Sequence, residues 1–330
     1  MEEKKKKRKY KYFLLIVSLI IAGIIAEGII RIVWEEPNYG YPNGLHIPDD
    51  TKGYRYQQNF KGYFLGEKYE NIEIKINNQG FRDEEHEYEK NKKRIIVLGD
   101  SVTFGAGVNQ DDTYVARMQK ERRDEIEIIN MGVNGYEMDQ EYILFLEEGK
   151  KYDPDLILLG IVLNDINQIE VQKLKEEMFK EEKKKELRTI LGKSCQSCKW
   201  IYILTKNLKR EKHNKQYIEK IYSLWENETL FEQYKQKVKE VKKEKEIVLI
   251  IFPYTEQFNN SLKYSKMPQE KIKKFAKEEN IKVLDLTDIL DTENYKELYL
   301  NKDNVHLNEE GHEKVAREIL NFLEKEKMLS

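Results

Sequence analysis

Five short apolar segments that alternate with helical patterns narrow the possible folds of this 330-residue chain more than any other feature. They are rich in Ile, Val and Leu, are too short for buried helices, and lie at Ile95–Leu98, Ile126–Ile129, Leu156–Ile161, Ile247–Phe252 and Ile281–Leu286. Apolar runs of this length are typical of strands buried on both faces. The helical patterns lie around Tyr114–Arg123, Tyr136–Glu148, Met267–Lys277 and Glu309–Glu326. Such alternation predicts an α/β domain whose mostly parallel sheet is covered by helices on both faces.

The first 34 residues have the composition of a membrane anchor. Lys4–Lys11 is almost entirely basic, and Phe13–Ala26 carries no charge. A helix that continues to Trp34 would rise about 33 Å, enough to cross a hydrocarbon core of about 30 Å. Glu27 and Arg31 lie four residues apart, where they can pair on one face of the helix.

The charge at the start of this segment also predicts its orientation. Basic residues before an anchor favour a cytoplasmic N-terminus. We therefore predict a cytoplasmic tail over residues 1–11, a transmembrane anchor over 12–34 and an extracytoplasmic remainder. A cleaved signal peptide is the alternative, because the charge-free run also fits an h-region. The retained anchor is favoured, since Ile24 stands where a small residue is needed if cleavage followed Ala26.

Composition divides the rest of the chain. Residues 35–93 are rich in aromatic and turn residues, and Ile72, Ile74 and Ile76 alternate with charged residues as in a half-buried strand. This predicts a membrane-proximal β-rich segment. Residues 94–330 then form the α/β domain, with a charged helical insertion at about 167–246. Within it, Lys173–Lys185 is expected to be a solvated helix face.

Overall charge and cysteine content exclude several classes of protein. The chain has 58 Lys and Arg against 60 Asp and Glu, so we expect no nucleic-acid partner. Two cysteines are too few for a disulfide-dense scaffold or a four-cysteine zinc site. Cys195 and Cys198 lie in the charged insertion without a surrounding βαβ pattern. We expect a local disulfide or two free thiols there, rather than a redox or metal centre.

Four polar blocks carry the chemistry that the sequence offers. They are Gly99–Val102, Asn130–Tyr136, Asn164–Asp165 and Asp303–His306. The first three follow predicted strands, and α/β sheets bind ligands at the carboxyl ends of their strands. Each block alone also fits an ordinary turn or helix cap. A serine nucleophile needs a base, and Asp303 lies three residues before His306, close enough to orient its ring.

In combination and chain order, these blocks resemble the SGNH (GDSL-type) hydrolase family over about residues 94–325. The resemblance implies a three-layer α/β/α sandwich with a mostly parallel five-stranded sheet, as in flavodoxin-like folds. It also implies that Ser101 is the nucleophile, that His306 is its general base and that Asp303 orients His306. The oxyanion hole would consist of the Ser101 N–H, the Gly135 N–H and the side-chain amide of Asn164.

The chain departs from the family pattern at two positions. Val102 stands where the family usually has leucine after the serine. Val162 stands where the Gly-x-Asn-Asp block has its glycine, and the nearest glycine is Gly160. No metal or organic cofactor is implied, because N–H groups hold the oxyanion.

The resemblance implies a serine esterase that forms an acyl-enzyme on Ser101. An external, membrane-anchored enzyme of this kind would act on an ester or acylated-glycan substrate, such as O-acyl groups of a cell-surface glycan or lipid. An O-acyltransferase for a cell-surface polysaccharide would use the same residues, with a sugar hydroxyl in place of water. A non-catalytic surface binding protein on the same scaffold is the third possibility. Retention of Ser101, Asp303 and His306 together argues against it.

Overall fold

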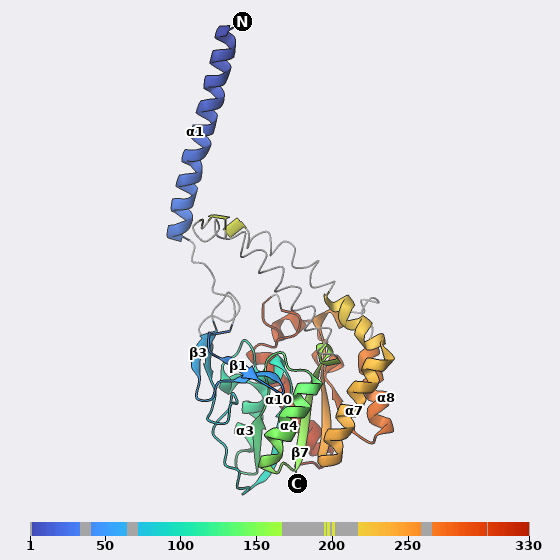
Figure 1. Cartoon of the computed structure of the whole chain (residues 1–330). Coiled ribbons are helices and arrows are strands. Elements are labelled where there is room, and N and C mark those ends of the chain that lie inside the picture. The colour runs from blue at the N-terminus through green and yellow to red at the C-terminus, as the bar shows by residue number, and fades with distance from the viewer. Residues whose placement is uncertain are drawn as a thin grey trace. The chain divides into compact units, whose positions relative to one another are not determined.

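The computed structural model describes residues 2–33, 41–64, 72–166, 195, 197–198, 200–201, 217–258, 266–301 and 303–329. Two compact units make up the chain (Figure 1). One consists of Met1–Asn38 and Gln172–Tyr217, and the other of Tyr39–Val171 and Ile218–Ser330. The charge run predicted at Lys173–Lys185 lies outside the described residues.

A five-stranded parallel sheet forms the centre of the second unit. Its strands are β5 (Lys93–Leu98), β6 (Ile126–Asn130), β7 (Leu156–Val162), β8 (Glu246–Phe252) and β9 (Lys282–Asp285). The spatial order is β6-β5-β7-β8-β9, and every pair of neighbours is parallel. The apolar runs of β5, β7 and β8 are buried almost throughout, because helices cover both faces of the sheet. The predicted fold class is confirmed.

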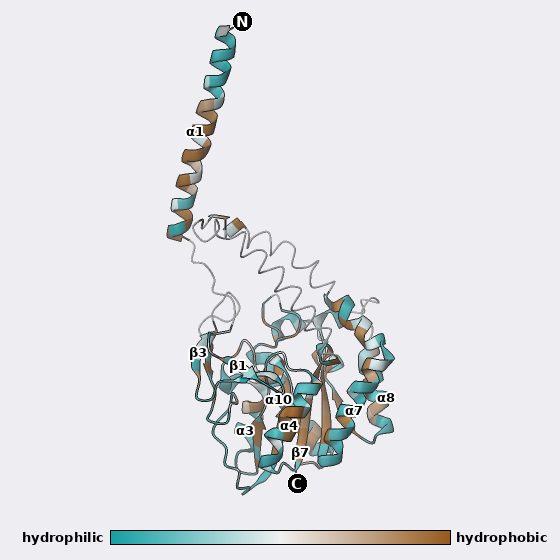
Figure 2. Cartoon of the chain, in the orientation of Figure 1, coloured by the Kyte–Doolittle hydropathy of each residue, from teal (hydrophilic) through white to brown (hydrophobic). Residues whose placement is uncertain are grey.

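Helices connect these strands and form the outer layers (Figure 1). They are α2 (Ser101–Phe104), α3 (Tyr114–Arg122), α4 (Met138–Glu147), α7 (Glu228–Glu244), α8 (Met267–Glu278), α9 (Thr287–Leu290) and α10 (Glu309–Lys325). Short 3₁₀ turns occur at η1 (Gln110–Asp112), η2 (Gly149–Tyr152), η3 (Leu163–Ile166), η5 (Thr255–Gln257) and η6 (Tyr295–Leu298). Helix α3 packs against α10, and α4 packs against α7. Figure 2 shows hydrophobic strands between helices that carry many hydrophilic residues.

Local sequence explains where the longer helices begin and which side they bury. The Asn308 side chain accepts the Gly311 N–H and caps α10, and Asn227 caps α7 in the same way. In α7 the buried residues recur at helical spacing: Phe231, Tyr234, Val238 and Val241. The amphipathic pattern therefore fixes the face that each helix turns to the sheet.

Two small hairpins precede the sheet within the same compact unit. Strand β1 (His46–Asp49) pairs with β2 (Gly53–Tyr56), and β3 (Lys61–Phe64) pairs with β4 (Ile72–Lys75), both antiparallel. Arg82 follows them and is almost fully buried. Its guanidinium donates to the carbonyls of Gly105 at 2.7 Å and Val108 at 2.8 Å. This arginine joins the segment to the loop that follows α2.

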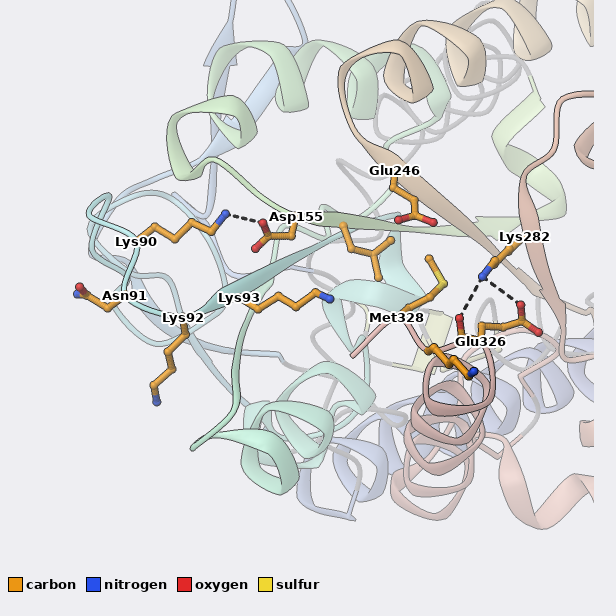
Figure 3. Close-up of a pocket in the computed structure, with 11 residues that line it drawn as sticks. Lys90, Asn91, Lys92, Lys93, Asp155, Glu246, Lys282, Glu326 and Met328 are labelled. Atoms are coloured by element: carbon orange, nitrogen blue, oxygen red, sulfur yellow. Dashed lines mark hydrogen bonds and ion pairs between the residues drawn. The ribbon is translucent and has the colours of Figure 1, made fainter. Parts of the chain in front are cut away.

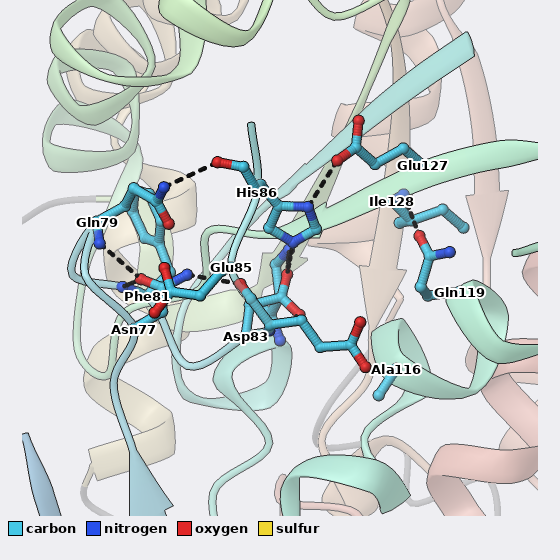
Figure 4. A network of polar contacts seen from close by, with 12 residues as sticks. Asn77, Gln79, Phe81, Asp83, Glu85, His86, Ala116, Gln119, Glu127 and Ile128 are labelled. Atoms are coloured by element: carbon cyan, nitrogen blue, oxygen red, sulfur yellow. Dashed lines mark hydrogen bonds and ion pairs between the residues drawn. The ribbon is translucent and has the colours of Figure 1, made fainter. Parts of the chain in front are cut away.

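His86 makes a second connection, to the edge strand β6 (Figure 4). Its Nδ1 lies 2.8 Å from Glu127 Oε1, and its Nε2 lies 3.1 Å from Asp83 Oδ2. Burial lowers the pKa of His86, but the hydrogen bonds and charges of Asp83 and Glu127 outweigh burial and raise that pKa to about 9. His86 is therefore positively charged at neutral pH, and its ion pair with Glu127 links this segment to the sheet. Sequence analysis assigned no role to His86. Asp83 lies three residues before it, but Glu127 is 41 residues away and becomes its neighbour only in the folded chain.

The first unit contains α1 (Glu2–Val33), which is long and apolar enough to cross a membrane. Helices of this composition occur both as membrane anchors and as signal sequences. The expected pair is present, with Arg31 Nε 2.9 Å from Glu27 Oε1. Cys195 and Cys198 form a disulfide, one of the two states expected for them.

Candidate active site

Ser101 is the first residue of α2, directly after strand β5. The Asp100 side chain accepts the Val102 N–H at 2.9 Å and so caps this short helix. Asp100 is buried, whereas Ser101 is partly exposed. The turn thus holds the serine hydroxyl at the carboxyl end of β5, next to the strand order reversal between β5 and β7. Ligands of doubly wound sheets bind at such a point.

Ser101, His306 and Asp303 form a continuous chain of hydrogen bonds. His306 Nε2 lies 2.9 Å from Ser101 Oγ, and His306 Nδ1 lies 3.1 Å from Asp303 Oδ2. A second acceptor of the serine hydroxyl, Asp100 Oδ2, is more distant at 3.3 Å. The buried Asp303 carboxylate accepts a hydrogen bond from the Nδ1–H of His306. The favoured tautomer therefore leaves the lone pair of His306 Nε2 facing Ser101.

Backbone contacts hold the loop that carries this histidine. Asp303 Oδ1 accepts the N–H groups of Val305 and His306, both at 3.0 Å. The Asn304 carbonyl accepts the Thr255 N–H at 2.9 Å. The Asn304 side chain donates to Glu256 at 3.1 Å. Burial raises the pKa of Glu256, and this hydrogen bond opposes the effect. The loop therefore has little freedom to move His306 away from the serine.

The glycine-containing block after β6 lies against the turn that contains Ser101. Asn130 Nδ2 donates to the Thr103 carbonyl at 3.0 Å, and Val133 N–H donates to the Gly99 carbonyl at 3.0 Å. A Cβ at Gly132 would lie 2.4 Å from the Phe104 nitrogen, so only glycine fits there. Gly135 has a φ of 73°, in the left-handed region that favours glycine. None of the described residues accepts a hydrogen bond from its N–H.

Asn164 lies in η3, immediately after β7. The Tyr254 hydroxyl donates to Asn164 Oδ1 at 2.9 Å. This bond identifies the oxygen side of the amide and leaves the nitrogen to donate elsewhere. Burial raises the pKa of Asp100, while hydrogen bonds from Val102 and Asn164 oppose that rise. The amide is thus held between Tyr254 and Asp100, beside the serine.

The departure at Val162 does not open the loop before Asn164. Asp165 Oδ2 accepts the Val162 N–H at 2.6 Å and closes a tight turn. Burial, together with the charges of Asp100 and Glu141, raises the pKa of Asp165 well above its usual range. Burial raises the pKa of Glu141 in the same way. In the described part of the chain, no three His, Cys, Asp or Glu side chains are arranged to hold a metal ion.

The structure places the site residues predicted from the sequence at the carboxyl ends of the parallel strands, together with further residues that were not predicted. Tyr54 and Tyr254 contact the site or its loops and were not singled out by sequence, and Asp100, inside the block Gly99–Val102, was given no role of its own. Tyr254 follows the buried strand β8, so its place after a strand end was a usable signal. Tyr54 had none, because its partner Asn134 is 80 residues away.

A pocket of about 810 Å³ lies at the opposite edge of the sheet (Figure 3). Its lining includes the first residues of four strands: Lys93, Leu156, Glu246 and Lys282. Lys282 pairs with Glu326 at 3.1 Å, and Lys90 pairs with Asp155 at 2.6 Å. These charges are matched within the fold, and the serine lies at the other ends of the strands.

Comparison with known families agrees with this geometry. The model of the GDSL-like lipase/acylhydrolase family matches residues 97–314, about two thirds of the chain. The chain therefore belongs to the GDSL-like lipase/acylhydrolase family. It is an ester hydrolase of that type. No curated protein sequence matches the chain significantly.

Several solved structures are similar to this chain at low sequence identity. A two-domain esterase active on acetylated mannans has 16% identity and a TM-score of 0.44 over 71% of this chain and 49% of its own. The match thus spans about half of that protein. A lipolytic G-D-S-L family protein from Veillonella parvula has 16% identity and a TM-score of 0.43, over 69% of this chain and 97% of its own. A catalytic mutant of the acetylxylan esterase Axe2 from Geobacillus stearothermophilus has 19% identity and a TM-score of 0.42, over 71% and 95%.

Proposed function

We propose that this protein is a serine esterase that forms an acyl-enzyme on Ser101. The observation that carries the proposal is the hydrogen-bonded chain from Ser101 Oγ through His306 to Asp303. His306 Nε2 takes the serine proton as Oγ attacks the ester carbonyl carbon. The same nitrogen then returns that proton to the departing alcohol oxygen. Asp303 stays ionised and stabilises the imidazolium.

Deacylation repeats these steps with water as the nucleophile. His306 removes a proton from water, and the water oxygen attacks the acyl carbon. His306 then returns that proton to Ser101 Oγ as the acyl bond breaks, which releases the acid and free Ser101. In both halves the carbonyl oxygen gains negative charge. We assign its stabilisation to the N–H groups of Ser101 and Gly135 and to the Asn164 amide. Their value is greatest when that charge is fully developed, because they are already oriented before the reaction begins.

The substrate class follows from the anchor and from exposure of the site. The basic residues Lys4–Lys11, in the first turns of α1 ahead of its apolar part, support a cytoplasmic N-terminus and an extracytoplasmic catalytic unit. The disulfide between Cys195 and Cys198 supports the same side, since disulfides persist in oxidising compartments. His306 retains 20% exposure of its side chain. We therefore propose O-acyl groups of a cell-surface glycan or lipid as the substrate.

The test uses the full-length chain in detergent. Wild type should hydrolyse an aryl acetate and be labelled by a fluorophosphonate, and Ser101→Ala should lose both activities. Adding an oligosaccharide acceptor distinguishes transfer from hydrolysis: acylated sugar in place of free acetate would identify an acyltransferase. Neither turnover nor labelling in a folded wild-type protein would instead support a binding protein.

A further inference from the structure

We propose that Tyr54 is a positioning residue that aims the Gly135 N–H at the oxyanion. This inference rests on the proposed function, because it concerns how the oxyanion hole is held. Tyr54 lies in strand β2 of the first hairpin, outside residues 97–314 that match the family model. The hydroxyl that matters is therefore supplied by a part of this chain that the family match does not include.

One hydrogen bond carries the argument. The Tyr54 hydroxyl donates to the Asn134 carbonyl oxygen at 2.6 Å. That carbonyl and the Gly135 N–H belong to the same peptide unit. In a planar trans peptide the C=O and N–H point in opposite directions, so fixing one direction fixes the other. Tyr54 thus determines where the Gly135 N–H points.

This peptide unit needs such a restraint. Gly135 has no Cβ and a positive φ, so rotation of the preceding peptide meets little steric resistance. A rotated peptide would present the Asn134 carbonyl, rather than an N–H, to a developing negative charge. The Tyr54 bond opposes that rotation, since breaking it leaves a half-buried hydroxyl and a carbonyl without partners.

Tyr54 itself is held from several sides. Its ring lies 5.3 Å from that of Tyr136 and 5.2 Å from that of His46, both edge-on. The Tyr136 hydroxyl donates back to the Tyr54 carbonyl. Burial, aided by the charges of Glu137 and Asp100, raises the pKa of Tyr54. The phenol therefore remains a donor across the pH range of an esterase.

The same hairpin offers a matched control. Tyr56 also bonds to Asn134, but its hydroxyl accepts the Asn134 N–H at 2.8 Å. That N–H belongs to the preceding peptide unit, between residues 133 and 134. Removing the Tyr56 hydroxyl therefore loosens the loop without releasing the peptide that carries the Gly135 N–H. Tyr63, which is 53% exposed on β3, serves as a neutral Tyr→Phe control.

The experiment compares steady-state kinetics and thermal melting of the full-length variants on an aryl acetate. Tyr54→Phe should lower kcat about tenfold to a hundredfold, with KM within about twofold of wild type, because the lost interaction belongs to the transition state. Tyr56→Phe should act mainly on stability: it should lower Tm, and it should lower kcat less than Tyr54→Phe does. Tyr63→Phe should match wild type. Replacement of Tyr54 by 4-aminophenylalanine, which keeps a donor at the same place, should restore most of kcat.

The outcomes separate this inference from the proposed function. Turnover that requires Ser101 but keeps normal kcat in folded Tyr54→Phe overturns the positioning role alone. Equal losses in Tyr54→Phe and in the 4-aminophenylalanine variant, including loss through unfolding, also overturn it, since the donor would then be irrelevant. Turnover that persists in Ser101→Ala, or no wild-type turnover, overturns the proposed function and this inference with it.

Discussion

We expect Asn164 to donate to the oxyanion rather than to cap a helix. Its amide lies between Tyr254 and Asp100, and the turn that contains it has only four residues. Asn164→Ala should therefore lower kcat about a hundred- to thousandfold, the equivalent of about 2.7–4 kcal/mol, and leave KM nearly unchanged. Aryl acetate kinetics alongside thermal melts test this. Near-normal kcat with an early melt would instead indicate a structural role.

Tyr254 contacts the Asn164 amide and should affect its donation indirectly, by orienting it. Without its hydroxyl, the Asn164 amide loses the contact that distinguishes its oxygen from its nitrogen. We expect Tyr254→Phe to lower kcat by about tenfold, less than Asn164→Ala, because the amide still reaches the correct orientation for part of the time. Combining the two changes should cost no more than Asn164→Ala alone. Additive losses in the double variant would contradict this dependence.

At the scale of single residues, sequence and structure differ in a consistent way. Ser101, Gly135 and Asn164 follow strand ends, so their proximity was predictable once the strands were recognised. We expect Tyr54 and Tyr254 to act by orienting other groups, the Asn134 carbonyl and the Asn164 amide. A tyrosine is also a common core residue, so its identity alone says nothing about the partner of its hydroxyl.

At the scale of elements, the ion pair made by His86 gives a pH dependence. Its pKa is about 9 in the fold, against about 6.5 when unfolded. Its stabilising contribution is therefore complete below pH 6.5 and is lost as the pH rises towards 9, with a full size of about 3 kcal/mol. His86→Gln should thus destabilise the protein strongly at pH 6 and weakly at pH 9.5. Denaturant titrations at both pH values check this; an equal loss at both would exclude a protonated histidine.

The elements differed in how far the sequence predicted them. The five strands of the sheet lie within two residues of the predicted ranges, because burial on both faces leaves uninterrupted apolar runs. In the segment before the sheet, only the Ile72–Ile76 alternation marked a strand. Strands β1, β2 and β3 have four residues each and contain glycine, proline or exposed tyrosine. Their pairing depends on contacts with the rest of the domain, and no local sequence pattern predicts those contacts.

At the scale of the whole molecule, helix α1 predicts on which side of the membrane the activity lies. The basic block precedes the apolar part of α1, so the catalytic unit should lie outside. Protease added to intact cells should digest that unit and abolish esterase activity. N-terminal sequencing of the mature chain distinguishes a retained anchor from a start near Glu27 after cleavage. Complete protection in intact cells, with digestion after permeabilisation, would contradict external placement.

Because the early hairpins pack into the same core as the sheet, they also limit where this chain can be truncated or fused. Leu45, Tyr56, Phe64 and Ile74 are buried in the same core as the sheet, although the family match begins only at residue 97. A fragment cut at that border would expose an apolar surface and leave Glu127 without His86. A fusion that replaced helix α1 would therefore have to join the chains before residue 41. The folded unit is therefore larger than the region that the family model matches.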